Sequence, residues 1–227
     1  MSDLSRSLVL DPRVYVGGGV APPATLEDRS RYGNNGTFSG SMAWVKNASG
    51  IWYLKRDTAQ SVNIPTSASL TSGLVKQNSF VVWTKRSGGS IGNSAWAGLI
   101  TQNTGNWLLQ WDYNITAGGC DIGFSFIEVG GASKYLATNT MYPQGTWYFI
   151  VGTWDGQYSK IYVNCVLSKT SADWSAFTPR STASITYILG SLNRGGDNSV
   201  GYFRVYNRVL TLDEQSRLYT RTKGWFI

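Results

Sequence analysis

Short runs of β-branched and aromatic residues recur along the chain, separated by clusters of Gly, Asn, Asp and Ser. Clear examples are 78–86, 96–102, 107–111, 146–154, 160–167 and 200–206. Such runs are typical of β-strands, and turn residues between them at regular short intervals are typical of sandwiches and jelly rolls. The run 147–151 is apolar at every position, as in strands buried on both faces. We therefore expect an all-β fold in which two antiparallel sheets pack as a jelly-roll sandwich.

One short helix is expected near the C-terminus, over residues 211–219. Thr211 and Glu214 have the spacing of a capping box, in which each side chain accepts a hydrogen bond from the other residue's backbone. The acidic residues of the first turn and Arg217 near the end suit the helix dipole. Because two turns of helix are not stable alone, this helix must pack on a sheet.

The chain is predicted to form a single domain over 1–227, with a core of about 8–219 and a short apolar and basic tail at 220–227. No apolar run reaches the ~20 residues that span a bilayer. The first six residues contain no apolar signal core, so we expect either synthesis in the cytosol or a chain whose signal has been removed.

The composition excludes several kinds of catalytic site. The chain contains no histidine, which rules out a Ser-His-Asp triad and any histidine metal ligand. Only 13 residues are acidic, and no segment contains the closely spaced acid pair of a glycosidase strand. Asp112, Asp121 and Asp155 are isolated in sequence and are expected to hold turns or strand ends. We therefore do not expect an enzyme.

The two cysteines, Cys120 and Cys165, leave two alternatives: one disulfide, or two free buried thiols. The formal net charge is +7, and its excess lies in residues 1–56 and 180–227. If the chain ends are neighbours in the fold, they form one basic face that favours an anionic partner. The alternative is ordinary solvated surface charge.

Several motifs resemble, in order and spacing, those of a known family. Residues 145–156 and 160–164 resemble a hairpin of that family. Its first strand begins with a tryptophan, an Asp-Gly turn follows, and its second strand ends in Tyr-Val-Asn. Residues 28–36 resemble its opening turn, and residues 201–210 resemble its last strand before the helix. The chain is thus similar to the laminin-G-like, concanavalin A-like jelly-roll family over most of 8–219.

The resemblance implies chain ends that lie close together and non-catalytic lectin-like, adhesive or structural roles. It also implies a calcium ion near the sheet rim in many members, for which Asp28, Asn34 and Asp57 are the candidate ligands here. The alternative is that Asp28, with Ser30 and residues 33–36, shapes a turn.

Two positions depart from the family pattern. Gly201 stands where the family often has an aspartate, which removes one carboxylate from the expected calcium site. Cys165 stands where the family has a turn glycine, and this substitution predicts a different backbone shape there.

Tryptophans offer a second kind of binding site, because sugars stack on aromatic rings. Trp96, Trp107 and Trp111 lie around one pair of expected strands and are the candidate carbohydrate-binding residues. Trp107 and Trp111 share one face of their strand, and they form a platform if that face meets solvent. The alternative is that they belong to the core.

The chain ends on apolar residues, which gain free energy by burial. Lys223, Trp225, Phe226 and Ile227 are therefore candidate docking residues, and we expect the tail to pack against the domain or a neighbouring subunit.

These observations favour a non-catalytic lectin-like binding or structural module. We interpret it as a phage virion component, made in the host cytoplasm, that decorates a capsid or belongs to a tail. Its expected partners are capsid or tail proteins, cell-surface glycans, or both; we also expect a homo-oligomer and no nucleic acid. The alternatives are a secreted, extracellular glycan-binding or adhesion domain of a larger protein and, third, a glycoside hydrolase.

Overall fold

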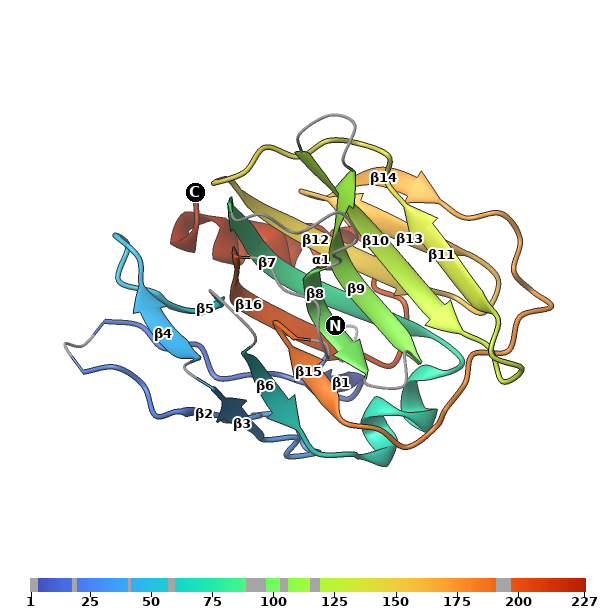
Figure 1. Cartoon of the computed structure of the whole chain (residues 1–227), viewed down its shortest axis with the longest axis horizontal. Helices are drawn as coiled ribbons and strands as arrows, with labels where there is room; N and C mark the ends of the chain where they lie inside the picture. The colour runs from blue at the N-terminus through green and yellow to red at the C-terminus, as the bar shows by residue number, and fades with distance from the viewer. Residues whose placement is uncertain are drawn as a thin grey trace.

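The computed structural model describes residues 4–17, 20–40, 42–56, 60–88, 97–102, 106–114, 119–190 and 197–227. These residues form two antiparallel sheets of eight strands each, stacked face to face, with one α-helix on the outside (Figure 1). The expected all-β jelly-roll sandwich with a short C-terminal helix is thereby confirmed.

The first sheet has the strand order β14-β13-β12-β7-β16-β5-β4, and β1 pairs with β16 beside this path. Its strands are β1 (Leu8–Leu10), β4 (Ala43–Lys46), β5 (Trp52–Arg56), β7 (Asn78–Gly88), β12 (Trp147–Trp154), β13 (Ser159–Val163), β14 (Val166–Thr170) and β16 (Asp197–Tyr206). All eight residues of β12 are buried, as the apolar run predicted, because one sheet face meets the second sheet and the other meets the helix.

The second sheet has the strand order β11-β10-β9-β8-β15-β6-β3-β2. Its strands are β2 (Thr25–Leu26), β3 (Gly36–Ser39), β6 (Ser61–Ile64), β8 (Ala97–Gln102), β9 (Trp107–Asn114), β10 (Gly119–Ile127), β11 (Ser133–Ala137) and β15 (Thr186–Ile188). The 3-10 turns η1 (Ala68–Leu70) and η2 (Ser72–Leu74) link β6 to β7 and so connect the two sheets.

The main core lies between the sheets and follows from the alternation of side chains along each strand. On β7, Phe80 and Val82 point into this core, whereas Val81 and Trp83 belong to a second cluster on the outer face of the first sheet. Both sets are fully buried, so the first sheet is apolar on two sides.

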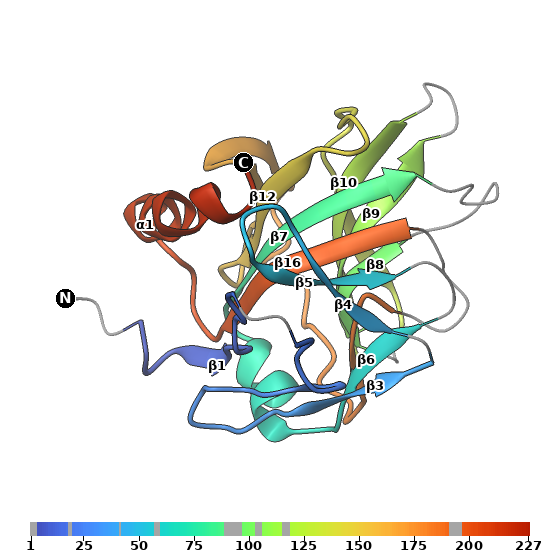
Figure 2. The ribbon, with the colours of Figure 1, turned by 90° about the vertical axis from the view of Figure 1, so that its left-hand side faces the viewer.

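The helix α1 (Leu212–Thr222) and the turn η4 (Lys223–Trp225) cover that outer face, as Figure 2 shows. The capping box is present, with Thr211 Oγ1 accepting from Glu214 N at 3.3 Å. Arg208 donates to both carboxylate oxygens of Glu214 at 2.7 Å, which fixes the start of the helix. At its other end, the indole N–H of Trp83 donates to Thr222 Oγ1 at 2.7 Å.

The segments near the two chain ends are neighbours, as expected. Strand β1 pairs with β16, and Asn207 N donates to the carbonyl of Ser7 at 3.0 Å. No helix in the described part of the chain is long and apolar enough to cross a membrane. Cys120 and Cys165 are both free, so no disulfide joins them; Cys120 is buried as expected, whereas Cys165 is only half-buried.

Candidate ligand-binding face

The face of the second sheet that points away from the first sheet carries a row of side chains that are polar or aromatic except for one leucine. Register partners project from the same face of a sheet, so this row runs directly across strands β6, β15, β8, β9, β10 and β11. It spans about 24 Å, at ~4.8 Å between strands. Its members are Asn63, Tyr187, Thr101, Leu108, Ser125 and Tyr135.

A second row on the same face contains little side-chain volume. This row crosses β8, β9, β10 and β11, and its register partners in that order are Gly98, Gln110, Gly123 and Ala137. A Cβ added at Gly123 would lie 2.6 Å from Tyr135 Cε2, so the Tyr135 ring packs directly over this glycine. A Cβ at Gly98 would lie 2.9 Å from the carbonyl oxygen of Gly190. Gln110 is therefore the one long side chain in the described part of this row.

Gln110 is buried without hydrogen bonds. It is 1% exposed, and neither its amide nitrogen nor its amide oxygen has a partner. A buried polar group in this state costs about 1–3 kcal/mol unless a ligand or a water satisfies it, so each such group calls for an explanation. The amide has two N–H donors and one acceptor oxygen. Two neighbouring sugar hydroxyls, each of which can donate and accept, can therefore bond to both ends of it.

Tyr135 is the most accessible aromatic side chain of the row, at 42% exposed. It lies one strand beyond Gly123 and two strands beyond Gln110, on the edge strand β11. A ring on this face and a buried amide beside it together supply the two features of a sugar site, a stacking surface and a hydrogen-bonding group.

The tryptophans proposed as a stacking platform face the opposite way, which corrects that prediction. Trp107 is 3% exposed and Trp111 is 1% exposed, and both belong to the core between the sheets. Trp107 packs against Phe80 at 4.6 Å between ring centroids, and the Trp111 indole N–H donates to Thr84 Oγ1 at 3.1 Å. Odd positions of β9 point inward, so the core alternative applies to both residues. Trp96 lies outside the described residues.

The carboxylate of Asp28, the first proposed calcium ligand, is already surrounded by hydrogen-bond donors and does not fit a calcium ion. Oδ1 accepts from Asp11 N at 2.8 Å and from Ser30 N at 2.9 Å. Oδ2 accepts from Ser30 Oγ at 2.7 Å and from Asn34 N at 2.6 Å. These four donors use the carboxylate's four lone-pair sites, which a cation would need.

Asn34, the second proposed calcium ligand, has hydrogen-bond partners of its own. The amide nitrogen of Asn34 donates to the carbonyl of Val9 at 2.8 Å, so this side chain ties two segments together. Asp57 lies outside the described residues. Within the described chain, no three Asp, Glu, Cys or His side chains form a group that could hold a metal. The residues fit the alternative, a turn built around Asp28.

The C-terminal tail packs against its own domain, as one of the two expected outcomes. Phe226 is 9% exposed and stacks on Trp83 with ring centroids 5.2 Å apart. The carbonyl oxygen of Trp225 accepts a 2.6 Å hydrogen bond from Asn47 Nδ2. Lys223 and Ile227 are exposed. A docking role for the four tail residues stays a prediction.

Two acidic residues that looked isolated in sequence are direct neighbours in the fold. Asp112 on β9 is the register partner of Asp121 on β10. The Asp121 side chain is 4% exposed, and its Oδ2 accepts from Asn139 N at 3.1 Å. Asp155 behaves as expected, because its carboxylate accepts from the backbone N–H groups of Gln157 and Tyr158 in the turn before β13.

The two stacked sheets, their strand order and the helix on one outer face define a concanavalin A-like jelly roll. The family model described as the concanavalin A-like lectin/glucanases superfamily, of the laminin G type, matches residues 56–214. The chain belongs to this family. No curated protein matches the sequence.

Several solved structures with the same fold are binding domains of toxins. The binding domain of Paraclostridial Mosquitocidal Protein 1 aligns with a TM-score of 0.71 at 13% identity, over 96% of this chain and 53% of that one. The botulinum neurotoxin serotype G binding domain aligns with a TM-score of 0.70 at 18% identity, over 96% and 51%. A botulinum neurotoxin DC binding domain in complex with SialylT aligns with a TM-score of 0.69 at 14% identity, over 96% and 52%. The chain thus spans about half the length of these relatives.

Proposed function

We propose that this chain is a non-catalytic glycan-binding module that uses the outer face of its second sheet, the face turned away from the first sheet. The observation that carries this proposal is the buried, unpartnered amide of Gln110 between two glycines. Its family is lectin-like, and its structural relatives include toxin binding domains, one of them in complex with SialylT.

In this proposal the Tyr135 ring and the Gln110 amide act together. Rotation of the Tyr135 side chain away from Gly123 opens the glycine row to a sugar ring. The ring then stacks on Tyr135, while two neighbouring hydroxyls exchange hydrogen bonds with the amide of Gln110. The glycines matter because their missing side chains let the sugar approach the sheet backbone.

The proposal is tested by glycan-array screening followed by calorimetric titration of the best ligand. Tyr135→Ala and Gln110→Leu should each weaken binding by about tenfold or more, the size of one lost stacking contact or buried hydrogen-bond pair. Tyr32→Ala is the matched control, because Tyr32 is 38% exposed in the turn between β2 and β3. Equal loss in all three variants, or no glycan bound by the folded wild type, contradicts the proposal.

We further propose that the module works in a phage virion, as a capsid decoration or tail protein, and forms a homo-oligomer. A small sandwich with a ligand-binding face on one sheet can be attached to an assembly through the rest of its surface and still present that face. Mass spectrometry of purified virions tests the location, and sedimentation velocity tests the oligomer. Its rival is an extracellular glycan-binding or adhesion domain within a larger protein, which the half-length alignment to toxin binding domains favours.

A glycoside hydrolase is the second candidate, and the register pair of Asp112 and Asp121 favours it. Retaining glycosidases need two carboxyl groups about 5 Å apart on one sugar-binding face. Release of reducing sugar from the array's best polysaccharide, lost in Asp121→Asn and kept in Asp155→Asn, would support hydrolysis. Binding without release would support the non-catalytic proposal.

A further inference from the structure

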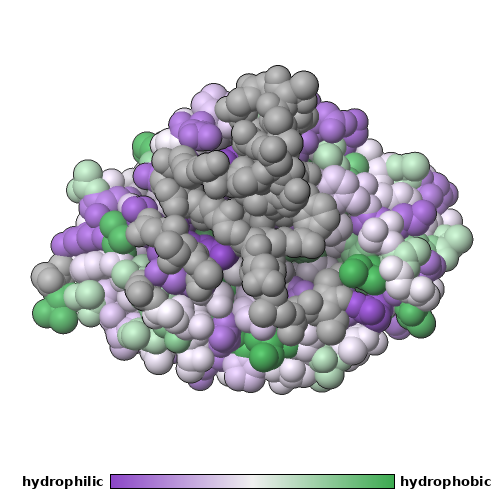
Figure 3. Space-filling view, in the orientation of Figure 1, coloured by the Kyte–Doolittle hydropathy of each residue, from purple (hydrophilic) through white to green (hydrophobic). Residues whose placement is uncertain are grey.

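Three polar side chains form a row between the two sheets. On the molecular face seen in Figure 3, hydrophilic and hydrophobic residues are interspersed. Inside the sandwich, Arg56, Asn198 and Arg86 lie side by side on β5, β16 and β7, because Asn198 is the register partner of both arginines. Val200 and its register partner Leu54, each two positions along from this row, belong to the core between the sheets. Since side chains alternate along a strand, the row points into the same space.

All three side chains of the row are almost completely buried. Arg56 and Arg86 are each 2% exposed, and Asn198 is 0% exposed. Arg56 reaches across the sandwich, where its Nη1 donates to the carbonyl oxygen of Leu189 at 2.8 Å. Burial removes hydration from the guanidinium group and lowers the pKa of Arg56. The row therefore holds two positive charges in a place where a negative charge would be stabilised.

Asn198, between the two arginines, has no hydrogen-bond partner for either end of its amide. Both Nδ2 and Oδ1 are fully buried and unpartnered. The nitrogen can donate two hydrogen bonds and the oxygen can accept. A buried amide with both ends unmet calls for an explanation, and a ligand that accepts and donates at the same point supplies one.

We propose that Arg56, Asn198 and Arg86 bind a small oxyanion that also carries a hydroxyl group, of which hydrogen phosphate is the simplest. Guanidinium groups bind phosphate oxygens through charge-assisted hydrogen bonds, which are often bidentate. Asn198 Nδ2 donates to a further oxygen, and Asn198 Oδ1 accepts from the P–O–H group. Sulfate has no hydroxyl at neutral pH and leaves Oδ1 unmet, so the site favours phosphate over sulfate. Glycolate, whose carboxylate stands beside a hydroxyl, offers the same combination.

The row lies near one rim of the sandwich, so an ion reaches it from the strand ends. Arg56 is the last residue of β5, and Asn198 is the second residue of β16. Figure 2 shows the arrowhead of β7 and the start of β16 at this same end, on the right-hand side of the view. The row points between the sheets, whereas the glycan-binding face is the outer face of the second sheet. This oxyanion site goes beyond the proposed function and does not depend on it.

Calorimetric titration of the wild type with phosphate, sulfate and glycolate, at constant ionic strength, tests the site. Phosphate should bind, and sulfate should bind about tenfold more weakly because one hydrogen bond is lost. Phosphate should also raise the melting temperature, since a ligand that binds only the folded state stabilises it. Tighter binding of glycolate than of phosphate would support the site and identify a 2-hydroxy acid as its ligand. No phosphate binding, or equal effects of phosphate, sulfate and chloride, would mean an adventitious ion only and would overturn the proposal.

Asn198→Asp places a carboxylate between the two arginines without changing the shape of the side chain. It should melt at a higher temperature than the wild type in phosphate-free buffer, and phosphate should no longer stabilise it. Asn78→Asp is the matched control, because Asn78 on the neighbouring strand β7 is also 0% exposed but has Trp154 as its register partner in place of an arginine. The control buries a carboxylate there, so it should melt below the wild type and keep its response to phosphate.

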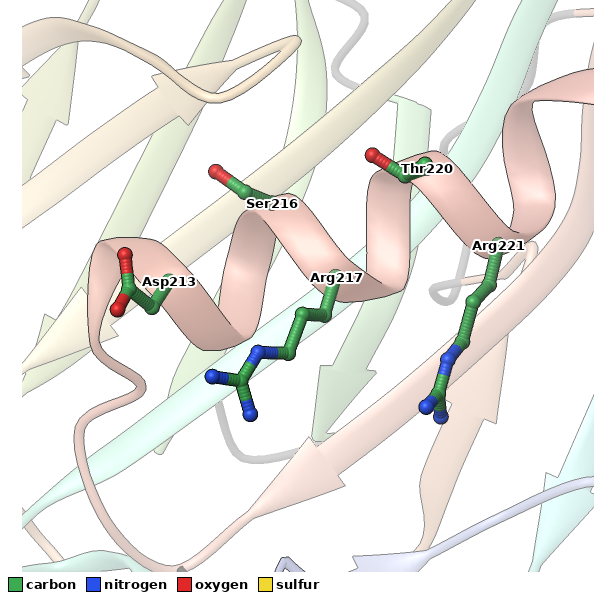
Figure 4. A pocket seen from close by; sticks show the side chains of 5 residues that line it. All are labelled: Asp213, Ser216, Arg217, Thr220 and Arg221. Atoms are coloured by element: carbon green, nitrogen blue, oxygen red, sulfur yellow. The ribbon is translucent and has the colours of Figure 1, made fainter.

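Arg86→Gln removes one charge of the row and should weaken phosphate binding by about tenfold or more. Arg217→Gln makes the same change in charge in the exposed hollow on the outer side of α1 (Figure 4), and phosphate binding should stay within about twofold of the wild type. Thermal unfolding checks that both variants are folded. Equal weakening in both, or an Asn198→Asp variant that melts below the wild type and still responds to phosphate, would overturn the site. Glycan binding by Asn198→Asp should be unchanged.

Discussion

The phenyl ring of Phe226 lies directly against the Cα of Gly201. A Cβ added at this glycine would collide with the ring edge. Gly201 falls at a register shift of β16 between Val200 and Tyr202, on the outer face of the first sheet. The C-terminal tail therefore fills the space that a side chain at position 201 would need.

The Gly201–Phe226 contact predicts a coupled mutant pair. Gly201→Ala should lower the free energy of unfolding by about 1–3 kcal/mol, because its methyl group displaces a buried ring. Phe226→Ala should lower it by about 2–3 kcal/mol through lost burial against Trp83 and Trp147. In the double variant, Gly201→Ala should lower the free energy of unfolding little further, because the Phe226 ring that its methyl group would meet is absent. Urea unfolding measures all three.

Gly130→Ala is the control for this cycle, because nothing lies within 4 Å of a Cβ at this exposed turn position. Its stability should stay within about 0.5 kcal/mol of the wild type. Strict additivity of Gly201→Ala and Phe226→Ala would show that the tail does not rest on the glycine.

Gln110 predicts a substitution that stabilises the fold while it removes ligand binding. Gln110→Leu should raise the free energy of unfolding by about 1 kcal/mol, because it replaces an amide whose two polar atoms have no partner. The control is Gln102, also buried in the second sheet, whose amide donates to the carbonyl of Leu70 at 2.8 Å and accepts from Asn106 at 2.6 Å. Gln102→Leu should cost about 2 kcal/mol.

Thermal or urea unfolding of both leucine variants, without ligand, checks this prediction. Opposite signs for the two glutamines would show that the Gln110 amide is kept at a cost in stability. A loss at Gln110 as large as the loss at Gln102 would mean that its amide does make stabilising hydrogen bonds, and the case for a ligand there would fall.

The strands and the helix follow from local sequence, but the face that a strand presents does not. The capping box of Thr211 and Glu214 fixed the start of α1, and the apolar run of β12 marked a strand buried on two sides. On β9, the tryptophans and the residues between them alternate as predicted. Which set meets the core depends on packing against the first sheet, as with Phe80 beside Trp107, and no local pattern contains that information.

Register contacts were equally invisible in the linear sequence. The pairing of Asp112 with Asp121 needs the register of the β9–β10 hairpin, and the row of Gly98, Gln110 and Gly123 needs that register and the next. One signal was available for Gln110: it stands between Leu109 and Trp111 in an apolar strand, where an amide has no packing role.

Asp28 predicts a stability effect that does not depend on calcium. Asp28→Asn should lower the free energy of unfolding by about 2–3 kcal/mol, because an amide cannot accept from all four donors around the carboxylate. Asp173→Asn, at an exposed turn carboxylate that accepts from Ser175 N, should cost about 0.5 kcal/mol or less. Excess calcium or EDTA should leave the wild-type melting temperature unchanged. A calcium-dependent rise that Asp28→Asn abolishes would restore the metal site.

The turn at Cys165 keeps the backbone shape of the glycine that it replaces, contrary to expectation. Asn164 and Cys165 join β13 to β14 with φ values of 50° and 67°, both in the left-handed region. These angles define a type I′ turn, which has this conformation at both central positions whatever the side chain. The cysteine therefore carries strain that glycine would not.

This strain predicts that Cys165→Gly is more stable than Cys165→Ala by about 1 kcal/mol, because both variants lose the thiol and only alanine keeps the left-handed penalty. Burial also raises the pKa of the Cys165 thiol. A raised pKa means less thiolate at a given pH, so alkylation of Cys165 in the folded protein should be slower than in the unfolded chain and should accelerate as the pH rises. Cys120, fully buried between the sheets, should react only on unfolding. Equal stability of the glycine and alanine variants would contradict the strained turn.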